Sequence, residues 1–280
     1  MKNLEKILYI NLGCGDCFID DDLWLNLDFS PCDSSVRQAN LLGKLPLLDE
    51  SIKFAYSSHF LEHIPYEKVD KFLAECYRIL QKNGIIRLVV PDLENICQEY
   101  LEQRKKGEHE KANFCIIELL DQCVRTESGG RLGRYYRDLA ENEQHSQYMI
   151  DYVRYRMGED ILNSYSHFHS DNRILDKFKR LTLQKINRRV ASLWISFITS
   201  LLPRAFREQN ISYCSIGEKH AWMWDFYTLS NKLTEVGFRD IQKLSYNTSN
   251  IPDFPLFPLD INSDGTPRKG CSSMYVEAMK

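Results

Sequence analysis

The sequence has no long hydrophobic run and almost no excess of charge of either sign. Its 280 residues include 36 lysines and arginines against 39 aspartates and glutamates, a net charge of −3 that gives no reason to expect a nucleic-acid partner. The longest apolar stretch, residues 191–202, is broken by serine and threonine and is much shorter than a bilayer span. The N-terminal segment lacks the cleavage site of a signal peptide. We therefore expect a cytoplasmic protein without a transmembrane helix.

The cysteines lack the spacing of a disulfide framework or of a zinc site. Nine are scattered along the chain, which fits reduced thiols. Cys14 and Cys17 form a Cys-x-x-Cys pair, but no second pair with similar spacing follows. Residues 260–265 resemble the start of a calcium loop, yet its twelfth position holds Cys271 instead of a bidentate acid, which favours a polar turn. The sequence therefore predicts no metal site.

Strand-like and helix-like segments alternate over the first hundred residues, which is typical of an α/β fold with a mainly parallel sheet. The expected strands are residues 4–12, 24–29, 36–39, 53–58 and 85–90. Apolar residues at helical spacing predict a helix between Pro65 and Gly84, with Asn83 and Gly84 forming its C-terminal cap.

The strand pattern stops near residue 94 and returns only towards the C-terminus. Residues 94–215 are polar and helical in pattern, which indicates an insertion. A late helix is expected from Thr228, as its N-terminal cap, to Val236, with Gly237 closing it. Strands at 238–246 and 273–278 then complete the sheet.

A glycine turn follows the first strand, and an acid ends the second. Gly13 and Gly15 would direct backbone amides at a nucleoside, while Asp28 could accept hydrogen bonds from both ribose hydroxyls. The dinucleotide fingerprint is incomplete, because Phe18 replaces its third glycine and Asp16 would repel phosphate. An acidic loop favours a positively charged cofactor, such as the sulfonium S-adenosylmethionine. A nicotinamide-dependent oxidoreductase is a distant alternative.

Five strings, in order, resemble class I S-adenosylmethionine-dependent methyltransferases of the type found with surface-polysaccharide biosynthesis. They are NLGCG at 11–15, WLNLD at 24–28, LPLLDESIKFAYSSHFLEHI at 45–64, RILQKNGIIRLVVPDL at 78–93 and GEKHAWMWDFYTLSNKLTEVGF at 217–238. The resemblance implies a Rossmann-like seven-strand sheet with a long helical insertion after the fifth strand. It also implies cofactor contacts from Asn11, Gly13, Gly15, Asp28, Asn40, Ser58 and His59. The family usually has an acid where this chain has Asn40.

The resemblance also divides the chain by role. We expect a cofactor-binding α/β part at 1–106, a helical insertion on the acceptor side at 107–215, and a C-terminal completion of the α/β domain at 216–280. By resemblance, the activity would be O-methylation of a sugar or glycan intermediate. A non-catalytic module that binds S-adenosylmethionine or a partner is the alternative.

Three histidines are the candidates for acting on the acceptor. Methyl transfer depends mainly on positioning, and a base is needed only if the acceptor hydroxyl keeps its proton. His59 and His63 follow the fourth strand, four positions apart, and would share a helix face, while His220 could approach from the opposite side. His63 is the main candidate base, since an ordinary histidine pKa of about 6.5 suits proton removal near neutral pH. The alternative is that these histidines only form local hydrogen bonds.

A basic amphipathic segment lies within the insertion. Residues 177–207 carry eight lysines and arginines and no acid, and apolar residues recur at helical spacing between 190 and 202. This pattern favours a helix packed on the domain with its charges in solvent. The alternative is that residues 185–207 contact the inner membrane surface or an anionic acceptor, such as a nucleotide sugar or a lipid-phosphate-linked glycan.

Overall fold

The structure is a computed structural model that describes residues 6–158, 194–195, 197–214 and 217–280. A seven-stranded sheet with the order β3-β2-β1-β4-β5-β7-β6 forms its centre. The strands are β1 (Tyr9–Leu12), β2 (Trp24–Asp28), β3 (Val36–Gln38), β4 (Ile52–Ser58), β5 (Leu80–Pro91), β6 (Arg239–Leu244) and β7 (Ser273–Met279). The first five are parallel to one another, and β7 runs antiparallel between β5 and β6. The predicted Rossmann-like seven-strand sheet is confirmed.

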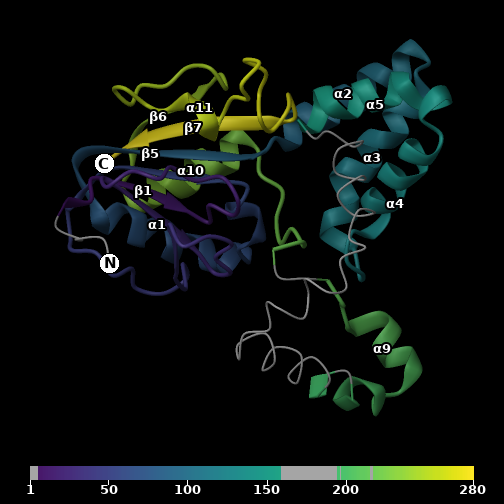
Figure 1. Ribbon diagram of the computed structural model, residues 1–280, viewed down its shortest axis with the longest axis horizontal. Coiled ribbons are helices and arrows are strands. Elements are labelled where there is room, and N and C mark those ends of the chain that lie inside the picture. Colours follow the sequence, from purple (N-terminus) through teal and green to yellow (C-terminus); the bar gives the residue numbers. More distant parts are fainter. Residues whose placement is uncertain (1–5, 159–193, 196, 215–216) are drawn as a thin grey trace.

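Two helices cover one face of the sheet (Figure 1). Helix α1 (Tyr66–Ile79) and helix α10 (Phe226–Val236) pack together and bury their apolar stripes against the strands. Gly237 ends α10 with a φ of 113°, as predicted. The N-terminal cap is Asp225 instead of Thr228, because the Asp225 carboxylate accepts the backbone N–H of Thr228 at 2.6 Å.

Helix α1 ends at Ile79, earlier than the predicted cap at Asn83 and Gly84. Leu80 is already extended and pairs with Ile52 at the start of β4, so sheet pairing removes the chain from the helix. Asn83, with a φ of 64°, instead forms an irregularity inside β5. The sequence correctly indicated a change of chain direction at Asn83 and Gly84, but this change lies within β5 and not at the end of α1.

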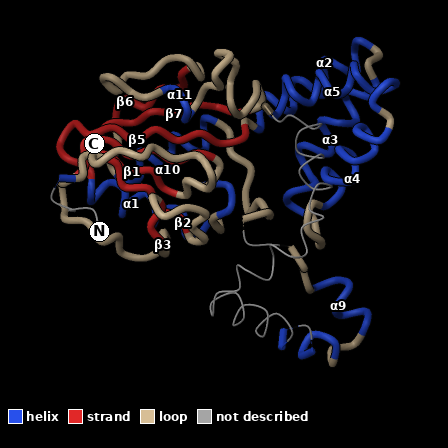
Figure 2. The backbone as a smooth tube through the Cα atoms, viewed as in Figure 1, coloured by secondary structure: helices blue, strands red, loops and turns tan. Residues whose placement is uncertain are grey.

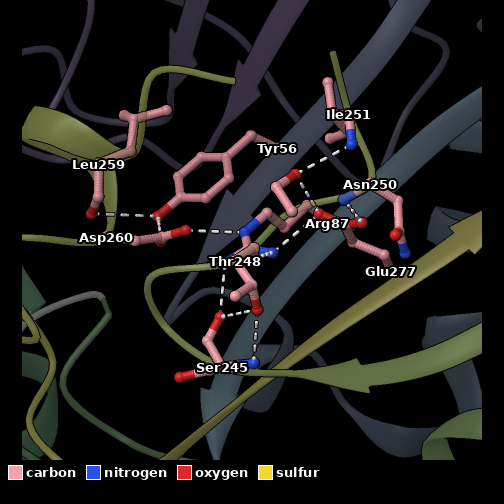
Figure 3. A network of polar contacts seen from close by, with 10 residues as sticks. Tyr56, Arg87, Ser245, Thr248, Asn250, Ile251, Leu259, Asp260 and Glu277 are labelled. Carbon is pink, nitrogen blue, oxygen red and sulfur yellow. Dashed lines mark hydrogen bonds and ion pairs between the residues drawn. The ribbon is translucent and has the colours of Figure 1, made fainter. Parts of the chain in front are cut away.

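The chain between β6 and β7 covers the other face of the sheet. Figure 3 shows a network of polar contacts between this chain and the strands. Arg87 of β5 is fully buried there, with its Nε 2.7 Å from Asp260 and its Nη1 2.8 Å from Glu277. The hydroxyl of Tyr56 donates to the other carboxylate oxygen of Asp260 at 2.7 Å. The two carboxylates compensate the lost hydration of the guanidinium. Asp260 therefore belongs to a buried ion pair just after α11 (Leu256–Leu259), whereas residues 262–266 form the predicted polar turn.

The described residues between β5 and α10 are helical, as predicted. Helices α2 (Leu93–Lys106), α3 (His109–Val124), α4 (Gly130–Glu141) and α5 (Glu143–Met157) form a group beyond the end of β5, and α9 (Arg204–Asn210) lies apart from it (Figure 2). Across this part of the described chain, the only β pairings are two isolated bridges, Asp92–Trp224 and Glu127–Tyr213. The role boundaries at 106 and 215 stay predictions.

The basic amphipathic segment lies mostly outside the described residues. Its described apolar side chains are exposed, from 36% to 70%, instead of packed on the domain: Trp194, Ile195, Phe197, Ile198, Leu201, Leu202 and Phe206. Among the helices that the structure describes, none combines the length and the hydrophobicity needed to cross a bilayer.

Candidate active site

The glycine turn and the acid of the second strand meet at the carboxyl edge of the sheet. Gly13 and Gly15 have φ values of 70° and 56°, and the backbone N–H of Gly15 donates to Asp28 Oδ2 at 3.0 Å. Asp28 Oδ1 also accepts the N–H of Ser30 at 2.7 Å. Each carboxylate oxygen keeps further acceptor capacity, so Asp28 can stabilise both turns and still receive ribose hydroxyls.

Gly13 is required by its surroundings as well as by its backbone angle. A Cβ at this position would lie 2.6 Å from the ring of Phe60. The N–H of Gly13 donates to the carbonyl of Leu27 at 2.9 Å, which anchors the turn to β2. The glycine turn therefore packs directly against Phe60, the residue that follows His59.

Two buried polar atoms near this edge lack a hydrogen-bond partner among the described residues. They are Oδ1 of Asn11 in β1 and Oγ of Ser58 at the end of the neighbouring β4. Buried polar atoms normally have partners, so a polar ligand fits here. Asn40 is exposed, and its Oδ1 accepts the N–H of Leu42 at 3.1 Å. Its predicted contact with the cofactor stays a prediction.

The negative charge of the loop is partly offset. Asp16 lies 3.2 Å from Arg268, which comes from the chain before β7. The carboxylate of Asp16 is exposed, so this ion pair is weak. The pair nevertheless reduces the repulsion between Asp16 and a phosphate group that the sequence analysis used against a dinucleotide cofactor. The acidity of the loop therefore contributes less to the preference for a sulfonium cofactor than the sequence alone indicated.

The three predicted histidines line one cavity of about 440 Å³ between the sheet edge and the helical insertion. His63 and His220 lie with their ring centres 5.0 Å apart. The remaining lining includes the polar side chains of Gln122, Asn262, Arg268, Lys269 and Ser272. The structure thus brings the residues that follow β4 together with a segment more than 150 positions away, and a contact between His63 and Lys219 joins the two.

His59 and His63 do not share a helix face, contrary to the prediction. The chain turns at His59, which has a φ of 49°, before the short 3-10 helix η2 (Leu61–His63) begins. His59 Nε2 lies 3.0 Å from Ser273 Oγ, and its Nδ1 lies 3.3 Å from Oε1 of Glu62. Both ring nitrogens of His59 are therefore close to protein groups.

Burial makes these histidines weaker bases than free imidazole. It lowers the pKa of His63, lowers the pKa of His220 to about 3, and places the pKa of His59 well below its ordinary value. His63 Nδ1 lies 2.8 Å from the carbonyl of Lys219, and because a carbonyl only accepts, Nδ1 carries the proton. His63 Nε2 then keeps its lone pair.

Glu62 is a site residue that the sequence prediction did not include. It is fully buried, neither carboxylate oxygen has a hydrogen bond among the described residues, and burial raises its pKa to about 8. Its backbone carbonyl accepts the N–H groups of Ala221, at 2.7 Å, and Trp222, at 3.2 Å. Its position between two candidate histidines was the available signal, but its burial depends on the distant segment that covers it.

Residues 22–88, from β2 through most of β5, match the family model of a methyltransferase domain. These residues form a methyltransferase domain. The fold is that of the class I enzymes, and the cofactor is S-adenosylmethionine. The glycine turn, Asp28, and the unpaired atoms of Asn11 and Ser58 fit that cofactor.

Solved structures of methyltransferases resemble this methyltransferase only distantly. An S-adenosylmethionine-dependent methyltransferase from Methanosarcina mazei is 13% identical with a TM-score of 0.40, covering 100% of this chain and 94% of that one. A possible histamine N-methyltransferase from Thermotoga maritima is 14% identical with a TM-score of 0.37, covering 98% and 82%. These low scores carry no argument about substrate. No curated protein matches the chain.

Proposed function

We propose that this methyltransferase methylates a hydroxyl group of a sugar or glycan intermediate, of the type used in surface-polysaccharide biosynthesis. The supporting observation is the cavity beside the three histidines, whose wall carries amide, hydroxyl and basic side chains. Such a wall suits a small, polyhydroxylated acceptor, because each ring hydroxyl needs a hydrogen-bond partner once it leaves water. The five sequence strings support the link to polysaccharides.

In this reaction, one group of residues would bind the cofactor and another would bind the acceptor. Gly13, Gly15 and Asp28 would hold the nucleoside end of the cofactor, which supplies an electrophilic methyl group when bound. His59, His63 and His220 would hold the acceptor hydroxyl. The acceptor oxygen would take up the methyl group in exchange for its proton, which His63 Nε2 would accept, so that the products are a methyl ether and S-adenosylhomocysteine. Most of the rate enhancement comes from this positioning.

His63→Ala tests the acceptor side of the site. We expect turnover to fall about 100-fold or more, since groups that assist proton removal contribute roughly 10²- to 10⁴-fold, while affinity for S-adenosylmethionine stays unchanged. Methyl-donor turnover on a panel of nucleotide sugars, with calorimetric titration of the cofactor, measures both.

The matched control is His109→Ala, because His109 is exposed on α3. Unchanged turnover in His63→Ala would transfer the role to His59 or His220. Methylation of amines but of no sugar would contradict the proposed acceptor.

We also propose that residues 185–207 contact the inner membrane surface peripherally, on the cytoplasmic side. Residues 185–193 lie outside the described part, but the described apolar side chains from Trp194 to Phe206 are exposed next to Arg204 and Arg207. Exposed apolar groups beside basic ones suit an anionic lipid surface.

A further inference from the structure

Glu62, His63 and His220 place three potential metal ligands side by side. One ligand atom from each residue lies within 4.8 Å of the other two. Glu62 is 0% exposed and His220 is 6% exposed. Both carboxylate oxygens of Glu62 and Nδ1 of His220 have no hydrogen bond among the described residues. Two of the three residues thus carry buried ligand atoms without a hydrogen bond, and a common partner for them fits this position.

We propose that Glu62, His63 and His220 bind one divalent transition-metal ion of the zinc type. Two imidazoles and one carboxylate form the donor set of many catalytic zinc sites, in which three protein ligands leave a fourth position open. His63 offers its Nε2, because its Nδ1–H donates to the Lys219 carbonyl. Such a hydrogen bond on the second nitrogen commonly orients a metal-binding histidine.

Only side-chain adjustments are needed to form this site. Tetrahedral ligands about 2.0–2.1 Å from zinc lie roughly 3.4 Å from one another, so spacings of up to 4.8 Å must close by as much as about 1.4 Å. The backbone is already held in place. The carbonyl of Glu62 accepts two N–H groups from Ala221 and Trp222, and the N–H of His220 donates to the carbonyl of Gln122 at 2.9 Å.

The surrounding charges are compatible with an ion at this point. Lys269 and Arg268 line the same cavity and disfavour a dication, but Arg268 is paired with Asp16, and Glu62 would lose its proton on binding the ion and so offset the charge of Lys269. His59 Nδ1, 3.3 Å from Glu62 Oε1, is placed to orient the carboxylate. Burial also keeps His220 neutral, and a neutral imidazole is the form that binds a metal.

An ion here would change how the acceptor is activated. A hydroxyl in the open fourth position loses its proton more readily, because the ion lowers the pKa of a coordinated oxygen. His63 would then act as a ligand instead of a free base. This consequence rests on the proposed function, whereas binding of the ion does not.

Titration of the full-length, chelator-treated chain with Co²⁺ and Zn²⁺ tests the proposal. We expect one ion per chain and a cobalt spectrum without thiolate-to-metal charge transfer, since the donors are nitrogen and oxygen. Glu62→Gln and His220→Gln should each weaken binding by more than roughly 100-fold, because even outer-shell partners contribute about 10- to 100-fold.

Two controls make the result specific. His109→Gln should bind the ion as the parent does, and a Cys17→Ser, Cys32→Ser double variant excludes the two thiols near the glycine turn that are not buried. Circular dichroism checks folding, and His63→Gln replaces either ligand variant that fails to fold.

Fewer than one ion per chain, a thiolate band, or parental affinity in Glu62→Gln would overturn the proposal. One ion bound without turnover on any sugar would support this site and count against the proposed acceptor.

Discussion

At the scale of single residues, Asp28 holds two turns in place and keeps acceptor capacity for the proposed cofactor contact. Its carboxylate fixes the glycine turn through Gly15 and the following turn through Ser30. These bonds use one acceptor direction on each oxygen and leave others for a ligand. The carboxylate is therefore positioned before the cofactor arrives, which lowers the ordering cost of binding.

Asp28→Ala should weaken binding of S-adenosylmethionine by about one to two orders of magnitude. Hydrogen bonds to a charged group contribute roughly 1.5–3 kcal/mol each, and about 1.4 kcal/mol corresponds to a tenfold change in affinity. Calorimetric titration measures the change. Asp33→Ala is the matched control, because Asp33 accepts the N–H of Ser35 at 2.8 Å in a similar turn without contacting a glycine. Parental affinity in a folded Asp28→Ala protein would show that the cofactor site is misplaced.

At the scale of elements, Arg87 joins the middle of the sheet to the chain that covers it. The guanidinium extends from β5 to Glu277 on β7 and to Asp260 after α11 (Figure 3). It also donates to the carbonyl of Thr248 at 3.0 Å. One side chain thus fixes the position of the 245–260 segment over the face of the sheet.

Arg87→Met should lower the free energy of unfolding by about 3–5 kcal/mol, because it leaves two buried carboxylates without their cation. Urea unfolding measures this loss. Combining it with Asp260→Asn and Glu277→Gln should restore part of the stability, since no buried charge then remains uncompensated. Lys106→Ala, which breaks an exposed pair with Glu102, should change little. Equal stability of Arg87→Met and parent would contradict this account.

At the scale of the whole molecule, the segment around α9 differs from the sheet in how far its apolar side chains are buried. The sheet and its covering elements bury their apolar residues, whereas the described residues 194–206 expose theirs. A surface of this kind, with basic residues beside it, is typical of membrane contact.

The chain should sediment with anionic vesicles and not with neutral ones, and salt should weaken the binding, because charges are screened beyond about 8 Å at physiological ionic strength. Trp194→Ser with Phe197→Ser should reduce binding. Leu101→Ser, which removes an exposed apolar residue of α2, is the control. Binding that ignores salt, or equal binding to neutral vesicles, would argue against an anionic membrane partner.

Local patterns were sufficient for much of the fold and for the proximity of the glycine turn to Asp28. The strand runs and the apolar spacing of α1 are properties of neighbouring residues, so they can be read without knowing what packs against them. Gly13 and Asp28 follow adjacent parallel strands, whose carboxyl ends share one edge. Their proximity was therefore predictable. The end of α1 was not, because pairing of Leu80 with Ile52 overrides the turn signal at Asn83.

The acceptor side depended on packing between distant segments. The sequence identified His59, His63 and His220 as residue types that could act on a hydroxyl, and it identified the acids and basic residues that later form pairs. It did not indicate that Glu62 would be buried without a side-chain hydrogen bond, because the distant segment around His220 packs against it. Burial and pairing are set by contacts between residues far apart in the chain, and these determine which carboxylates support the fold and which remain available for chemistry.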